Sequence, residues 1–287
     1  MRLLWAFPIL VLTSLIKVPF NAPLEGGGRS LRFSQIDSTI FDEKKAIVAK
    51  NVSEPHAAQA LAVARSFLGI PYVTGTLDHN TKEQLVINLR QLDCWTLVEA
   101  SLAFALNGSE GNFDTFQQHI QQLRYWGGTI DSYGSRIHYF TGWLLQAEKM
   151  GYLEDVTRDL GGIPYKKKIG YITARPQKYP KIKDPAILQA LRSAEARINH
   201  HPWYFIPKAR IAMKEHLIRE GDLIILTSAK GDLDIAHQGF AVRRNGRIHL
   251  LHASSLAKKV IITGQPLAQY MAKQRGQTGI MVARIRD

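Results

Sequence analysis

The only cysteine of the 287-residue chain, Cys94, stands where a helix is predicted to begin. Apolar residues recur at helical spacing from Cys94 to Ala105, Asp93 suits the N-cap position, and Gly108 can end the helix. Unpaired N–H groups and the helix dipole favour an anion there, so we expect a lowered thiol pKa and a reactive thiolate. The same N–H groups could later hold an oxyanion. A structural cysteine at the start of a buried helix is the alternative, and this segment alone does not decide between the two.

A β-hairpin is predicted near the C-terminal end, around the dipeptide Asn245-Gly246. This pair is a strong signal for a two-residue turn between two strands. A turn centred there pairs His237 with Ser254 and His252 with Gly239. All four residues then share one face of the hairpin, and the glycine leaves that corner open.

The two histidines of this face could serve as a general base and its orienter. As diagonal neighbours, His237 and His252 lie about 7–8 Å apart at the backbone, within reach of two imidazole rings. One ring would take the thiol proton, and the other would fix its tautomer and steady the imidazolium. His249 falls on the opposite face. Two ordinary sheet histidines are the alternative, but their shared face and the lone cysteine favour catalysis.

The elements that would position these residues run from helices to strands along the chain. Helices are predicted at 55–69, 93–106, 113–125, 136–149 and 185–199. Strands are predicted at 222–226, 235–242, 247–254, 259–263 and 279–285, with a helix at 266–275 before the last strand. Helices first and strands later indicate an α+β fold with a small antiparallel sheet. We find no clear linker, and we therefore treat residues 23–287 as a single domain.

Composition and the first residues bear on location. Hydrophobic residues make up 45% of the chain and charged residues 21%, which argues against a disordered or fibrous protein. The net charge of +13 favours polyanionic surroundings. Residues 1–22 hold an apolar run too short for a bilayer span, which needs about 20 residues, and suit a signal peptide or an uncleaved N-terminal anchor. We therefore expect an exported protein, in the periplasm or outside the cell.

The motifs around these residues resemble the NlpC-type cysteine hydrolases of bacterial cell walls. The resemblance lies in Asp93-Cys94, in His237-x-Gly239, in His252-Ala253-Ser254 and in the upstream segment 69–75 with Tyr72. Within that group the chain is most similar to the N-acetylmuramoyl-L-alanine amidase-like branch. That closer match rests on 133–139, 206–208, 221–222 and 232–237, and the whole resemblance covers roughly residues 55–285.

This resemblance implies a papain-like core, in which the cysteine helix packs on an antiparallel sheet that carries the histidines. It makes Cys94 the nucleophile, His237 the base and His252 the orienter, and it places the Tyr72 hydroxyl near the oxyanion. The residues expected to contact substrate are Asp93, Tyr133, Ser135, Arg136, His138 and Asp234. The chain departs from the family pattern at Trp95, where the peptide-cutting branch has a serine that helps to bind a free peptide amine.

The expected reaction is hydrolysis of the amide between N-acetylmuramic acid and L-alanine in peptidoglycan or muropeptides. The first alternative is cleavage of the D-glutamyl–diamino acid bond of the stem peptide. The second is a non-catalytic module that binds the wall or another anionic polymer. We expect no cofactor and no metal, because His200-His201 lacks a zinc motif around it. We also expect a monomer, no nucleic acid, and membrane contact only through the N-terminal segment. The basic stretch 157–184 is interpreted as a solvated loop rather than a single-strand binding surface.

Overall fold

The computed structural model describes residues 31–287. The predicted signal peptide or anchor at 1–22 lies outside the described residues. In the part that is described, no helix is long and apolar enough to cross a membrane.

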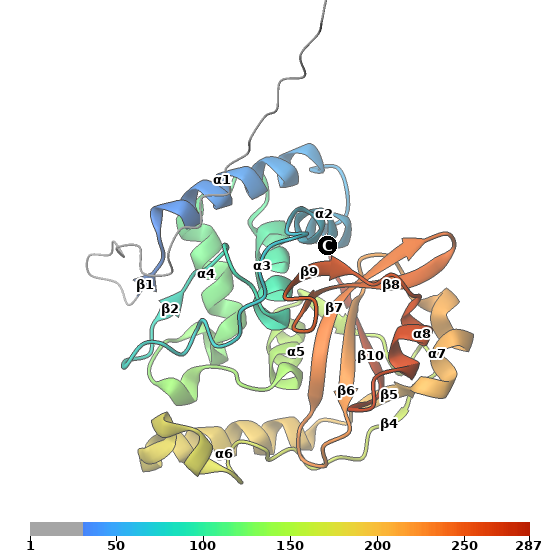
Figure 1. Ribbon diagram of the computed structural model, residues 1–287. Coiled ribbons are helices and arrows are strands. Elements are labelled where there is room, and N and C mark those ends of the chain that lie inside the picture. The colour runs from blue at the N-terminus through green and yellow to red at the C-terminus, as the bar shows by residue number, and fades with distance from the viewer. Residues whose placement is uncertain (1–30) are drawn as a thin grey trace, which may run out of the picture.

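The molecule has a helical side and a sheet side (Figure 1). The helices are α1 (Gln35–Lys50), α2 (His56–Ser66), α3 (Cys94–Asn107), α4 (Phe113–Arg124), α5 (Phe140–Lys149), α6 (Pro185–His200), α7 (Lys208–Lys214) and α8 (Leu267–Ala272). The strands of the large sheet are β3 (Leu153–Asp155), β4 (Ile163–Pro164), β5 (Tyr204–Pro207), β6 (Leu223–Ser228), β7 (Ile235–Arg244), β8 (Arg247–Ser254), β9 (Lys259–Ile262) and β10 (Gln277–Ile285). Two short strands, β1 (Leu31–Arg32) and β2 (Leu85–Val86), pair beside the helices.

The large sheet is antiparallel, in the order β4-β5-β10-β6-β7-β8-β9, with β3 added to β10. On one face, Phe240 and Leu251 pack in a core with Leu97 of α3. On the other face, Leu250 packs in a second core with Met271 of α8. The strands β6, β7 and β8 are therefore covered on both faces, which explains why their residues are mostly buried.

The α+β class and the predicted order of helices and strands are confirmed, but the sheet is larger than expected. Strands β3, β4 and β5 extend it beyond the predicted hairpins, and helices α1 and α7 were not predicted. The helix expected from residue 136 begins at Phe140, because Tyr133–Ser135 forms a 3-10 turn and the chain stays extended after it. The division into a single domain 23–287 stays a prediction.

The hairpin turn lies where it was predicted. Arg244 pairs with Arg247 and Phe240 with Leu251, which is the register of a turn centred on Asn245-Gly246. The pairing of β7 with β8 stops at Phe240–Leu251, however, so the expected ladder pairs of the two histidines do not form.

The basic stretch 157–184 is tied to the fold rather than free. The Lys167 ammonium donates hydrogen bonds to the backbone carbonyls of Ser228, at 2.5 Å, and Leu233, at 3.0 Å. Arg175 forms an ion pair with Asp232. These contacts anchor the stretch to the turn between β6 and β7, and two of its cations are used structurally.

Candidate active site

Cys94 is the first residue of α3, as the sequence predicted. The N-cap Asp93 accepts hydrogen bonds through its carboxylate from the backbone N–H of Trp95, at 3.0 Å, and of Thr96, at 2.8 Å. The Thr96 hydroxyl is 2.9 Å from the Asp93 backbone N–H and completes a capping box. These bonds fix where the helix begins, and they therefore fix the direction in which Cys94 leaves it.

The surroundings of the Cys94 thiol contradict the expected pKa. The residue keeps some contact with solvent, but desolvation of the thiol and the neighbouring Asp93 carboxylate raise the thiol pKa to about 12. Backbone N–H groups, including that of Gln238, favour the thiolate but do not outweigh burial. The sequence argument counted the helix terminus and missed the protein packed around it, so a resting thiolate is a wrong prediction.

His237 and His252 meet as the hairpin face predicted. Nε2 of His237 lies 2.5 Å from Nδ1 of His252, and the ring centroids are 4.8 Å apart at 86°. Beyond the end of the β7–β8 pairing, the N–H of Gln238 points at the Cys94 thiol. The histidine pair and the thiol therefore share one corner of the sheet, because Gln238 follows His237 directly.

Both histidines are neutral at neutral pH. Burial lowers the pKa of His237 to about 4. Burial, together with the neighbouring His237, lowers the pKa of His252 to about 3. A neutral thiol beside a neutral imidazole pair means that proton transfer has to accompany attack by the sulfur. His249 lies apart from this pair and bonds through Nδ1 to the Thr263 carbonyl at 2.8 Å.

Tyr72 is brought to the thiol by a loop that joins β9 to the start of α3. Its backbone N–H donates to the Lys258 carbonyl at 2.9 Å, and the N–H of Leu92 donates to the Pro71 carbonyl at 3.1 Å. Desolvation, and then the negative charge of a Cys94 thiolate, raise the pKa of the Tyr72 hydroxyl. The hydroxyl is therefore protonated at neutral pH and can donate a hydrogen bond.

Tyr270 on α8 is a residue of this corner that the sequence argument missed. Its ring centroid lies 5.6 Å from that of His252, in an edge-on arrangement. Burial raises its pKa, and so does the charge of a Cys94 thiolate. The residue is about 180 positions from the cysteine on a short helix, and no motif around it points to the site.

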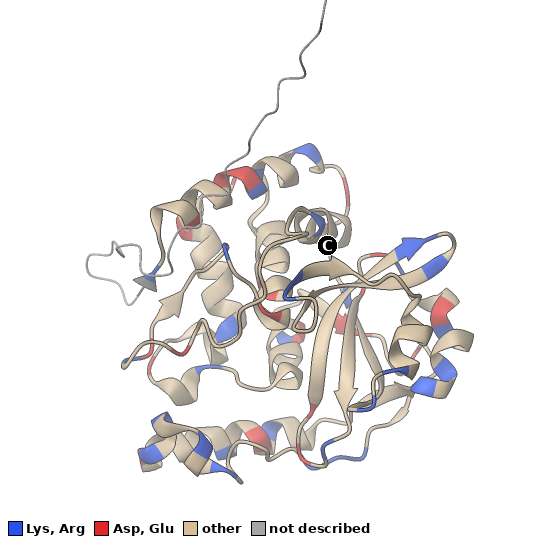
Figure 2. Cartoon of the chain, in the orientation of Figure 1, with Lys and Arg blue, Asp and Glu red and all other residues tan. Residues whose placement is uncertain are grey.

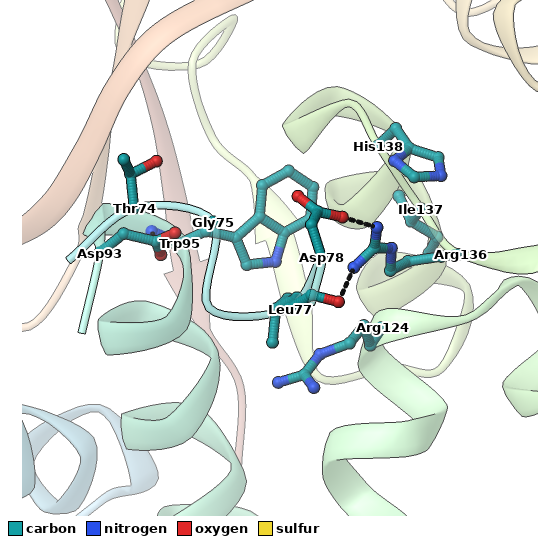
Figure 3. Close-up of a pocket in the computed structure, with 10 residues that line it drawn as sticks. All are labelled: Thr74, Gly75, Leu77, Asp78, Asp93, Trp95, Arg124, Arg136, Ile137 and His138. Atoms are coloured by element: carbon teal, nitrogen blue, oxygen red, sulfur yellow. Dashed lines mark hydrogen bonds and ion pairs between the residues drawn. The ribbon is translucent and has the colours of Figure 1, made fainter. Parts of the chain in front are cut away.

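A pocket of about 200 Å³ opens beside the start of α3 (Figure 3). The residues that line it are Thr74, Gly75, Leu77, Asp78, Asp93, Trp95, Arg124, Arg136, Ile137 and His138. Three of the expected substrate contacts, Asp93, Arg136 and His138, thus come together around the indole of Trp95. The pocket adjoins the nucleophile, because Asp93 and Trp95 flank Cys94 in the chain.

The charges of this pocket are held by internal contacts. Figure 3 shows the Arg136 guanidinium pointing at the Asp78 carboxylate, with which it forms an ion pair, and at the Leu77 carbonyl, 3.1 Å away. Arg124 is paired with the buried Glu99 of α3. Desolvation and the nearby Arg136 lower the pKa of His138 to about 3, so this ring is neutral. The pocket therefore offers fixed polar edges and an aromatic surface.

The remaining expected substrate contacts lie elsewhere or serve the fold. The ring of Tyr133 stacks on that of His138, with centroids 4.2 Å apart. The Ser135 hydroxyl donates to the Ser132 carbonyl at 2.8 Å and closes the 3-10 turn. Substrate contact by Tyr133 and Ser135 stays a prediction.

Asp234 holds two elements together. Its carboxylate accepts the backbone N–H of Thr141, at 3.0 Å, and the Thr141 hydroxyl, at 2.9 Å, which joins the start of α5 to the start of β7. Asp234 is buried, and desolvation raises its pKa. This position gives the residue a structural role, and a contact with substrate stays a prediction.

Charged side chains are sparse on the strands of the sheet and gather on the outer helices (Figure 2). Among residues 31–287, no three His, Cys, Asp or Glu side chains are grouped so that they could hold a metal ion. The corner of Cys94, His237 and His252 can support covalent acyl transfer, with proton movement between sulfur and imidazole.

Comparison with known proteins places this geometry in a family context. The family model of N-acetylmuramoyl-L-alanine amidase-like proteins matches residues 62–280, more than half of the chain. A solved N-acetylmuramoyl-L-alanine amidase from Bacteroides uniformis is 33% identical, covers 81% of this chain and 99% of its own, and superposes with a TM-score of 0.77. A proposed xylanase from Bacteroides fragilis is 34% identical over 77% of this chain and 98% of its own, with a TM-score of 0.72.

A more distant structure, a protein from Legionella pneumophila, shares the fold alone. It is 20% identical over 88% of this chain and 96% of its own, with a TM-score of 0.68. A comparison with curated proteins gives no match.

Proposed function

The chain belongs to the N-acetylmuramoyl-L-alanine amidase-like family, and from this premise we propose that it is an exported peptidoglycan amidase with a cysteine nucleophile. The proposed bond joins the lactyl group of N-acetylmuramic acid to L-alanine. The name of the Bacteroides uniformis relative supports this bond. The periplasm or the cell exterior is the proposed location, because that is where such a substrate lies, and we propose that the enzyme acts as a monomer.

One observation carries the proposal. The hydrogen bond between His237 Nε2 and His252 Nδ1, at 2.5 Å, occupies one nitrogen of His237. We assign the proton of this bond to His237, which leaves its Nδ1 unprotonated and able to act as a base. The N–H of the next residue, Gln238, faces the Cys94 thiol, so the base and the nucleophile lie at the same corner.

The proposed reaction begins with the neutral thiol and the neutral imidazole. Cys94 Sγ forms a bond to the amide carbonyl carbon while His237 accepts the thiol proton. The Tyr72 hydroxyl and the Cys94 backbone N–H hold the oxyanion. Collapse of the tetrahedral intermediate breaks the C–N bond, and His237 returns the proton to the leaving nitrogen. Water then hydrolyses the thioester, which releases a lactyl carboxylate and restores the thiol.

We further propose that α3 and the sheet form the papain-like core of the NlpC-type hydrolases. Packing of the cysteine helix against β7 and β8 supports this assignment. We favour the amidase over the stem-peptide endopeptidase because the indole of Trp95 lines the pocket at the position of the amine-binding serine. The indole offers an apolar face instead of a hydroxyl acceptor.

Digestion of purified peptidoglycan tests this function. The wild-type chain should release peptides with a free L-alanine amino group, identified by mass analysis of the digest. Cys94→Ala should release none while it still binds the wall. Fragments with a free diamino acid amine would identify the endopeptidase instead, and full activity of Cys94→Ala would exclude the cysteine mechanism.

A further inference from the structure

A second hollow lies between α5, α6 and the turn after α4, among residues that the proposed mechanism does not use. It has a volume of about 740 Å³. Its walls include Trp126, Leu145, Lys149, Arg197, His201 and Pro202. We call it the α5–α6 groove. Figure 2 shows basic residues on α6 at this side of the molecule.

Arg197 is an exposed cation with a fixed orientation. Its guanidinium carbon lies 4.4 Å from the centroid of the Trp126 ring. Across residues 31–287 the side chain has no acidic partner within ion-pair distance. Stacking holds a guanidinium plane in place while its N–H edge stays free for a planar, two-oxygen acceptor. Arg197 is therefore prepared to bind a carboxylate.

The rest of the groove keeps the same sign of charge. The exposed Lys149 of α5 lies on the opposite wall, and no acidic residue lines the hollow. The acids closest to this wall in the chain face each other instead, because the Glu148 carboxylate accepts the Asp155 backbone N–H at 2.8 Å. An anion that enters the groove thus meets two cations and no lining carboxylate.

Apolar surface interrupts the charges. Leu145, Pro202 and the edge of Trp126 line the groove between the two cations. Alternating apolar and cationic surface suits a chain of pyranose rings that carry carboxylates, because the ring faces are apolar and the acid groups lie at their edges. We propose that the α5–α6 groove binds a carboxylated oligosaccharide.

The identity of the natural polymer rests on the proposed function. Hydrolysis of the lactyl–alanine bond leaves a free lactyl carboxylate on each muramic acid that has lost its peptide. The glycan strand stripped by the enzyme thus becomes a chain of carboxylated sugars. The groove then retains the strand after each cleavage, while the next stem peptide reaches the corner of Cys94.

Calorimetric titration of the full chain with a galacturonate hexasaccharide tests the groove without catalysis. A neutral chitin hexasaccharide of equal length is the control ligand. Galacturonate should bind and chitin should bind at least tenfold more weakly, because charge-assisted contacts are lost. Arg197→Ala should weaken galacturonate binding by about tenfold, and Arg197→Lys by less, since it keeps the charge but loses the fork.

Matched variants separate the groove from the general positive charge. Arg192→Ala on the same helix and Lys50→Ala at the end of α1 remove exposed cations elsewhere, and both should bind as the wild type. Lys149→Ala should weaken binding as Arg197→Ala does. Hydrolysis of a small soluble muropeptide should be unchanged in all four alanine variants.

Three results would overturn the proposal: no binding of galacturonate, equal binding of chitin, or equal losses in Arg192→Ala and Arg197→Ala. Tighter binding of linear polyphosphate than of galacturonate would assign the groove to phosphate and also overturn it. Cys94→Ala should bind galacturonate as the wild type does. A chain that binds galacturonate but hydrolyses no muropeptide would keep the groove and refute the proposed reaction alone.

Discussion

Gly239 sits where any larger residue would disturb the histidine pair. A Cβ atom added there would lie 2.3 Å from the Leu251 carbonyl oxygen and 2.9 Å from Cβ of His252. Real Cβ contacts do not fall below 3.0 Å, so β7 and β8 would have to part by at least 0.7 Å at this point. The displacement falls directly on the residue that bonds His237 at 2.5 Å.

We expect Gly239→Ala to fold and to lose most of its turnover. Misplacement of a catalytic group by about 1 Å can cost about 100-fold in rate, so a shift of this size predicts a 10- to 100-fold lower kcat. Overpacking of the strands should also lower the free energy of unfolding by about 1–3 kcal/mol. Amide hydrolysis of a defined muropeptide and urea unfolding would measure the two effects separately.

Gly279→Ala is the matched control for this variant. A Cβ atom at Gly279 would lie 2.2 Å from the Ile206 carbonyl oxygen, an equal intrusion in β10, which does not carry the histidines. It should lower stability in the same way and leave kcat within about twofold, because only remote strands move. Equal losses of kcat in both variants, or a folded Gly239→Ala with wild-type kcat, would refute the role given to the histidine contact.

Three further predictions concern the corner of Cys94. Because burial and Asp93 raise the thiol pKa to about 12, iodoacetamide should label Cys94 at pH 7 more slowly than an unperturbed thiol with a pKa of about 8.5, as followed by mass spectrometry. Rapid labelling at pH 7 would indicate a resting thiolate instead. Because the pKa of His237 is lowered to about 4, the base is neutral above that pH. kcat/KM should rise with pH through about 4 and stay level through pH 8, and an acid limb near 6.5 would contradict this. The lowered histidine pKa values also mean that the folded state binds fewer protons than the unfolded chain, so their contribution to stability is lost as pH falls from about 6.5 to about 4. His252→Asn can still bond the His237 ring and should keep at least tenfold more kcat than His252→Ala, while His249→Ala should be nearly silent in the same assay. Loss of activity in His249→Ala alone would assign the orienting role to the wrong histidine.

Local signals explain which parts of the site could be predicted from sequence. The turn at Asn245-Gly246 depends on two residues, and it fixes the face of every side chain on both strands. The start of α3 likewise depends on the capping side chain of Asp93. The meeting of His237 with His252 followed from the first signal, and the place of Cys94 from the second.

The parts that could not be predicted depend on contacts between distant segments. The raised pKa of Cys94 comes from protein packed around the thiol, including the β7 backbone, which a helical pattern does not reveal. Helix α1 was missed because its buried face includes Asp37 and Lys44 beside Phe41, so its apolar periodicity is weak. Tyr270 reaches the corner only because α8 packs on the sheet face opposite α3.

The loop that carries Tyr72 is bonded to β9 on one side and to the residue before Asp93 on the other. Gly69 donates its N–H to the Val260 carbonyl at 2.9 Å, and Val260 donates to Ile70, also at 2.9 Å. Strand β9 in turn pairs with β8 at His252, opposite Ile261. The tyrosine, the cysteine and the second histidine thus belong to one continuous backbone network. Such a site is preorganised: it loses little conformational entropy when substrate arrives, and loop closure is not needed to assemble it.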